Sequence, residues 1–174
     1  MTSDQAKAAA DLLLTIWEGE FPATCAVLAA VKDDTRLYKP DAKSRTAWDL
    51  ATHMAHADMW FLDGIANGAF AWDPEKVKQA EAQFKSVDDI VSFYKKAFPE
   101  KVGALRALPG DKLASTISMF GNFDWPAVRY IGFATNHSVH HRGQLAAYLR
   151  AMGSKVPNIY GPSADTKDES AVVS

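Results

Sequence analysis

Four long stretches of the chain place apolar residues at the 3.6-residue spacing of an amphipathic helix, and this pattern limits the possible folds more than any other feature. The spacing predicts helices over about residues 3–31, 44–67, 86–108 and 124–152. No hairpin signal separates them, and residues 112–124 are the least helical part, with at most a short extended piece. The predicted fold class is therefore all-α, an up-and-down four-helix bundle.

Prolines and glycines refine the ends of these helices. Pro22 and Pro99 lie inside the first and third helices, where a proline removes a backbone hydrogen bond. We therefore expect a kink or interruption at Pro22 and a bend at Pro99. Pro126 suits the first turn of the fourth helix, where a missing amide costs little, and Gly153 is expected to stop that helix. Residues 70–85 are expected to form a mixed connection with charged surface positions.

Length and composition predict one globular domain. The chain has 174 residues, of which 48% are hydrophobic and 23% charged, so it can bury a core without a structural metal. We expect a single bundle domain over residues 1–163. The small and polar segment 164–174 is expected to be a flexible C-terminal tail.

Charge, the N-terminal sequence and cysteine content exclude several classes of protein. The net charge is -2 and the Lys and Arg residues are spread along the chain, so nucleic-acid binding is not expected. The N-terminus lacks the order of a signal peptide, and Glu18 and Glu20 interrupt its apolar stretch, so we expect no membrane span. Cys25 is the single cysteine, which excludes an internal disulfide and favours a cytoplasmic protein.

The five histidines fall in two clusters, both inside predicted helices, and histidine is the commonest metal ligand. His137 and His141 are four residues apart, so on a helix they share a face, which continues through apolar residues. His53 also lies on an apolar stripe. His56 and His140 lie on more polar stripes. Helical phase thus selects His53, His137 and His141 as the inward-facing set.

A metal ion is one explanation for three histidines that converge inside a bundle. The alternative is that they are core histidines with hydrogen-bond partners, which is the usual state of a lone buried histidine. Three unpartnered rings would each cost about 1–3 kcal/mol, and a shared divalent ion removes that cost. Ser138 stands where a zinc protease needs glutamate, which excludes that motif. Three histidines without a fourth protein ligand leave open positions, as in a catalytic site.

Several segments resemble the DinB-like superfamily of damage-inducible proteins, and the resemblance covers about residues 38–163. Its most specific part is C-terminal, and the segments that carry it are 43–53, 136–145, 148–150 and 156–163. The resemblance implies a four-helix bundle with a divalent transition metal (Zn, Ni, Fe or Mn) between the second and fourth helices. By motif, its ligands are His53, His137 and His141, the trio that helical phase also selects.

The resemblance also implies a function. Some members of the superfamily are S-transferases or isomerases that use a low-molecular-weight bacterial thiol such as bacillithiol or mycothiol, and dimers are common. We therefore expect a bacterial metal-dependent thiol S-transferase, a homodimer acting on a small-molecule substrate. Two alternatives remain open: a metal-dependent hydrolase of a small ester or amide, and a bundle that binds metal without turnover. No residue is assigned as the general base.

Other polar and aromatic residues near the histidines have less specific expectations. Arg142 is expected to be an exposed helix arginine, with binding of an anionic substrate group as the alternative. Asp58 is expected to be a surface charge, with a hydrogen bond from a metal-bound histidine as the alternative. Trp60 is expected to belong to the core, because aromatic residues at helical spacing usually do, with a place in the wall of a pocket as the alternative. Four further residues are expected around the metal ligands. Gln144 and Tyr148 are expected to orient ring nitrogens or substrate, and His56 and His140 are expected to lie beside the ligands or at the surface.

Overall fold

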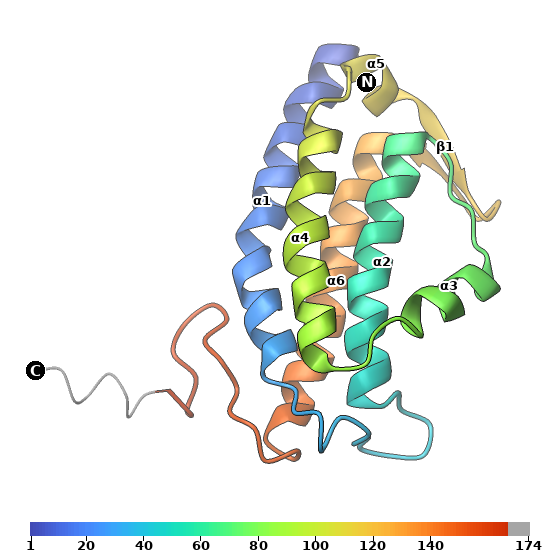
Figure 1. Ribbon diagram of the computed structural model, residues 1–174. Helices are drawn as coiled ribbons and strands as arrows, with labels where there is room; N and C mark the ends of the chain where they lie inside the picture. Colours follow the sequence, from blue (N-terminus) through green and yellow to red (C-terminus); the bar gives the residue numbers. More distant parts are fainter. Residues whose placement is uncertain (167–174) are drawn as a thin grey trace, which may run out of the picture.

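The computed structural model describes residues 1–166, and these form six helices and one small sheet (Figure 1). Four long helices pack side by side along their lengths. Their bounds are α1 Ser3–Ala29, α2 Ala47–Asn67, α4 Val87–Arg106 and α6 Ala127–Leu149. The all-α four-helix bundle that the periodicity predicts is thus confirmed.

The helices of the bundle do not alternate strictly in direction, which corrects the up-and-down part of the prediction. α2 and α4 run parallel, because Asp58 contacts Tyr94 and, further along both helices, Asp63 pairs with Lys101. α1 and α6 also run parallel, whereas α2 and α6 run antiparallel (Figure 1). The cause is residues 68–86, which return the chain along the outside of the bundle before α4 begins.

Side chains define where the long helices begin and end. Thr2, Thr46 and Ser86 each cap a helix in a capping box. The capping side chain accepts a hydrogen bond from the backbone of the third helical residue, whose side chain accepts one from the backbone of the capping residue. Gly68 ends α2 with a φ of 69°, a conformation that glycine adopts without steric cost. α6 ends at Leu149 rather than Met152, and Gly153 takes a φ of 71° shortly after it.

The two internal prolines do not interrupt their helices. α1 continues through Pro22 and α4 through Pro99. Phe21 and Phe98, the residues that precede these prolines, stack with ring centroids 5.1 Å apart. This contact is part of the packing of α1 against α4, which keeps both helices continuous despite the local signal of the prolines. Pro126 is the N-cap of α6 and the last residue of a strand.

The sequence did not predict the smaller elements between the long helices. α3 Pro74–Glu81 lies within the segment expected to be a mixed connection, and α5 Gly110–Ala114 follows α4. β1 Thr116–Met119 and β2 Phe123–Pro126 form an antiparallel hairpin where only a short extended piece was expected. Phe120 and Gly121 at its tip have φ values of 56° and 69°. Phenylalanine at such a position gives no turn signal in sequence.

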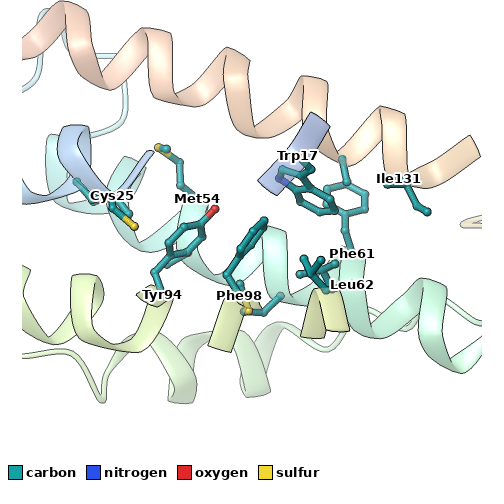
Figure 2. Packing of buried hydrophobic residues seen from close by; sticks show 14 of the residues in the cluster. Trp17, Cys25, Met54, Phe61, Leu62, Tyr94, Phe98 and Ile131 are labelled. Atoms are coloured by element: carbon teal, nitrogen blue, oxygen red, sulfur yellow. The ribbon is translucent and has the colours of Figure 1, made fainter. Parts of the chain in front are cut away.

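The core is aromatic and contains one carboxyl group. Figure 2 shows Trp17, Tyr94 and Phe98 packed together, and the ring of Phe98 lies 5.4 Å from Trp17 and 5.3 Å from Tyr94. Asp58 is fully buried among them, so the expectation of a surface charge was wrong. Its Oδ2 accepts hydrogen bonds from Tyr94 (2.7 Å) and Ser138 (2.9 Å). Burial raises the pKa of Asp58 to about 7, because both hydroxyls favour the carboxylate less than burial disfavours it.

Part of the C-terminal segment is held against the bundle. Asp165 accepts hydrogen bonds from Arg150 and from the backbone of Val156, and Thr166 donates one to Asn158. The rest of the predicted flexible tail, 167–174, lies outside the described residues, and the domain boundary at 163 stays a prediction.

One helix meets the length and composition criterion for a membrane span, although none was expected to. Within residues 1–166 this is α1 alone. The criterion is weak evidence, since core helices of globular proteins also meet it. In the structure α1 packs against α4, α5 and α6.

Replacing Asp58 with asparagine should change how stability depends on pH. The folded-state pKa of Asp58 is about 7, above its ordinary value of 3.8, so between these values the folded protein keeps a proton that the unfolded chain releases. The contribution of Asp58 to the unfolding free energy therefore falls as pH rises from 4 to 7, opposite in sign to the contribution of the buried histidines, whose pKa values are lowered. Asp58→Asn removes this loss, on the order of a few kcal/mol. Urea unfolding at several pH values measures it.

Asp63→Asn serves as the control for that measurement. Asp63 lies on the same helix but is half exposed, and its side chain pairs with Lys101 at the surface. We expect this variant to keep the wild-type pH profile. Parallel profiles for Asp58→Asn and the wild type would contradict the assignment of a protonated core carboxyl.

Candidate metal centre

The antiparallel contact of α2 with α6 brings three histidine rings together. His53 comes from α2, and His137 and His141 come from successive turns of α6. The ring centroid of His53 lies 5.2 Å from that of His137 and 4.7 Å from that of His141, and the two rings of α6 are 4.4 Å apart. One nitrogen of each ring lies within 4.8 Å of the corresponding nitrogens of the other two.

The surroundings keep these rings neutral. Burial, with a smaller contribution from the charge of Arg45, lowers the pKa of His53 to about 3. Burial and the neighbouring His141 lower the pKa of His137 to about 4, and burial also lowers the pKa of His141. A neutral imidazole has a lone pair on one nitrogen, and this lone pair is what a metal ion binds.

The three rings fit a divalent metal ion. The buried Nδ1 of His137 has no hydrogen-bond partner, so the protein itself does not satisfy this polar atom. Three imidazole nitrogens suit a transition metal such as zinc or nickel, whereas calcium and magnesium prefer oxygen. Among residues 1–166 this is the only group of three or more His, Cys, Asp or Glu side chains placed in this way. The three histidines are therefore placed to hold a metal ion.

Gln144 fixes the orientation of one of these rings. Its Oε1 lies 2.8 Å from Nδ1 of His141, and an amide oxygen can only accept a hydrogen bond. His141 therefore donates from Nδ1, which leaves the lone pair on Nε2. Such an outer hydrogen bond sets the tautomer of a metal-binding histidine and makes it a better ligand.

The other three residues expected near the ligands have different surroundings. His140 is exposed, and its ring centroid lies 5.0 Å from that of His141. His56 stacks against Phe84 at 5.0 Å, and its buried Nε2 has no hydrogen-bond partner. Tyr148 is half-buried and packs edge-on against Tyr38.

A cavity of about 540 Å³ lies beside the histidines, and His53 and His137 form part of its wall. Its other walls come from α2, from α3 and from the hairpin tip. Trp60, which was expected in the core, lines this cavity. Sequence reasoning missed Glu81 of α3 and Phe120 of the hairpin, because both segments were expected to be irregular and neither residue belongs to a recognisable motif.

Arg142 is buried, although it was expected to be exposed. Only 1% of its surface is accessible, and its Nη2 pairs with Glu20 of α1 at 2.6 Å. The hydroxyl of Tyr160 accepts a hydrogen bond from Arg142 and donates one to Glu20. This network joins α1, α6 and the C-terminal segment, and its residues do not line the cavity beside the histidines.

Comparisons with known proteins find a family and relatives that match most of this chain. The model of the DinB family matches residues 3–170. YrdA, an uncharacterised protein of Bacillus subtilis, is 28% identical over 160 residues, which cover 89% of this chain and 90% of that protein.

Solved structures show the same fold. A DinB-like protein from Bacillus cereus is 23% identical with a TM-score of 0.70, and the match covers 85% of this chain and 95% of that chain. A mycothiol-dependent maleylpyruvate isomerase is 12% identical with a TM-score of 0.55, and the match covers 83% of this chain and 61% of that one.

Removing any one ligand should abolish stoichiometric metal binding. We expect His53→Ala, His137→Ala and His141→Ala to lose the metal and to keep their helicity, since the bundle core does not include these rings. Elemental analysis of untagged protein, purified without chelators, measures this. His140→Ala is the matched control and should keep its metal. Equal metal content in His141→Ala and wild type would refute the ligand assignment.

Gln144→Ala should weaken metal binding without abolishing it. Loss of the hydrogen bond to Nδ1 of His141 lets the ring turn and change tautomer, and such outer partners typically contribute about 10–100-fold in affinity. Competition with a chromogenic chelator measures the affinity. Asn136→Ala, at an exposed position of the same helix, is the control. An unchanged affinity in Gln144→Ala would show that this hydrogen bond does not support the ligand.

Proposed function

The chain belongs to the DinB family, as its C-terminal motif indicated, and on this premise we propose that it is a metal-dependent thiol S-transferase. The observation that carries the proposal is the position of the three neutral imidazoles at the wall of a cavity of about 540 Å³. A metal held by three histidines has open coordination positions, and here those positions are next to space for a small molecule. The fold is also that of an enzyme whose name includes a thiol cofactor, the mycothiol-dependent maleylpyruvate isomerase.

The residues of the chain prepare the site in distinct ways. When bound, the metal supplies a Lewis acid that favours the thiolate form of a thiol at neutral pH. His53 and His137 stay unprotonated far below neutral pH, so protons do not compete for their lone pairs. Gln144 holds the His141 ring in place. Phe61 packs its ring 5.3 Å from that of His137 and shields that side of the site from water.

The proposed reaction forms one bond and breaks another. The sulfur of the thiol forms a bond to an electrophilic carbon of the substrate, and the leaving group departs with its electron pair. The thiol proton goes to the leaving group or to water. No side chain is assigned as the proton acceptor.

We also propose the setting in which the protein works. It is a homodimer in the bacterial cytoplasm that acts on a small molecule and does not bind nucleic acid or membranes. Leu12 and Ile16, 63% and 48% exposed, lie one turn apart on the outer side of α1, and a second copy would remove them from water. The buried thiol of Cys25 and the small net charge support the rest.

A thiol-transfer assay tests the proposed activity. Metal-loaded protein is mixed with bacillithiol, mycothiol or cysteine and a panel of electrophiles, and loss of free thiol is followed. We expect a metal-dependent rate that falls on the order of a hundredfold in His141→Ala, because a Lewis acid lowers the barrier by several kcal/mol. His140→Ala should retain the rate.

The same assay separates the alternatives. Cleavage of a small ester or amide at equal rate with and without thiol would identify a hydrolase that uses water. If the metal-loaded protein accelerates neither reaction above background, the bundle binds metal without turnover and the proposal fails.

A further inference from the structure

The cavity beside the histidines has an aromatic wall that is open to water. Trp60 stands at its centre, with Phe120 stacked on it at 5.6 Å and an interplanar angle of 10°. Trp72 meets the same indole edge-on at 6.0 Å. Phe120 is 56% and Trp72 52% exposed, so two large apolar rings border the cavity without being covered. Grouped exposed aromatic rings of this kind mark a binding site more often than a passive surface.

The central ring of this wall is held in place before any ligand arrives. The indole Nε1 of Trp60 donates a hydrogen bond to the carbonyl oxygen of Ala71 at 2.6 Å. Phe70 packs against Trp60 from the core side, over Gly64, where a Cβ atom would lie only 2.2 Å from the Phe70 ring. The glycine therefore lets Phe70 anchor the segment that carries Trp72. A rigid wall loses little conformational entropy when it binds a flat molecule.

The hairpin places the Phe120 ring at an energetic cost. Phe120 has a φ of 56°, which is unfavourable for a bulky side chain, and it is the only non-glycine residue with positive φ among residues 1–166. Such strained residues are concentrated at binding and catalytic sites. This backbone conformation places a solvent-exposed ring against Trp60, at the cavity and outside the core.

The polar groups of the cavity indicate the charge of its ligand. Glu81 is the acidic residue of the lining, and no lysine or arginine of residues 1–166 contributes to it. Asn122 adds an amide that can donate and accept hydrogen bonds. In the metal-free protein an anion would lose its hydration there, find no lysine or arginine in the lining and meet a carboxyl group. A neutral molecule pays none of these costs.

We propose that this cavity binds an uncharged, planar aromatic or conjugated substrate, with its reactive end toward His53 and His137. The volume, about 540 Å³, is within the range of small-molecule sites. The planar ligand stacks against the wall formed by Trp60, Trp72 and Phe120. The catalytic meaning of this site rests on the proposed function, which it deepens by naming the class of the electrophile. The binding itself requires neither metal nor thiol.

Two fluorescent probes with the same ring skeleton test the proposal. N-phenylnaphthylamine is neutral, and anilinonaphthalene sulfonate differs from it by one negative charge. We expect one molecule of the neutral probe to bind per chain of metal-free protein, at least about tenfold tighter than the sulfonate, because no lysine or arginine lines the cavity. Equal or tighter binding of the sulfonate, or no binding of the neutral probe, would overturn the proposal.

Two variants of the hairpin locate the bound probe. Phe120→Gly removes the stacking ring and suits the positive φ, so the fold should be kept while affinity for the neutral probe falls about fivefold. Phe123→Ala is the matched control, since Phe123 is also an exposed ring of this hairpin but does not line the cavity. An equal loss in both variants, or a loss only in Phe123→Ala, would refute the assignment.

A third variant tests the role of charge. Glu81→Gln removes the carboxyl group from the lining and should narrow the difference in affinity between the two probes, through tighter binding of the sulfonate. An unchanged difference would show that Glu81 does not set the charge preference of the cavity and would contradict the proposed selectivity.

The outcomes distinguish this proposal from the proposed function. If the probes fail to bind as expected but metal-dependent thiol transfer is observed, only the substrate class is wrong. If the neutral probe binds selectively and no thiol transfer occurs, the cavity assignment stands and the S-transferase proposal fails.

Discussion

The packing of α2 against α6 is the contact on which the rest of this structure depends. It brings His53 beside His137 and His141, and five residues further along α2 it brings Asp58 to Ser138. The candidate metal centre and the buried carboxyl of the core are thus two parts of one interface. Ligands from two rigid helices hold their positions more closely than ligands from loops, since each helix is fixed along its length by the core.

Helical periodicity predicted the long helices and selected the three histidines that the structure brings together, because both follow from a repeat of 3.6 residues that is visible locally. It failed for Asp58 and Arg142, which are buried charged groups. Their partners, Tyr94 for the first and Glu20 for the second, come from other helices. Whether a polar residue on a helix is buried depends on such distant partners, and no local pattern encodes them.

The cavity was also not predicted from the sequence, for a different reason. Its metal side comes from the bundle, but Glu81 and Phe120 come from α3 and the hairpin, which connect the long helices. Connections of this kind tolerate changes in sequence and length that a packed helix does not. The bundle thus carries the three histidines, and the connections between the helices shape what can lie next to them.

The parallel course of α2 and α4 has a consequence for access to the metal centre. α2 has 21 residues and is therefore about 30 Å long, so a chain that leaves its end and enters α4 must travel that length back. Residues 68–86 cover this distance along the outside of the bundle, and Trp72, Val77 and Glu81 of this segment line the cavity together with His53 and His137. The wall that residues 68–86 add to the cavity thus follows from the order and direction of the helices. Any protein with these helix directions needs a connecting segment that runs back along α2. Changes in the sequence of that segment can alter the entrance to the site while the bundle stays the same.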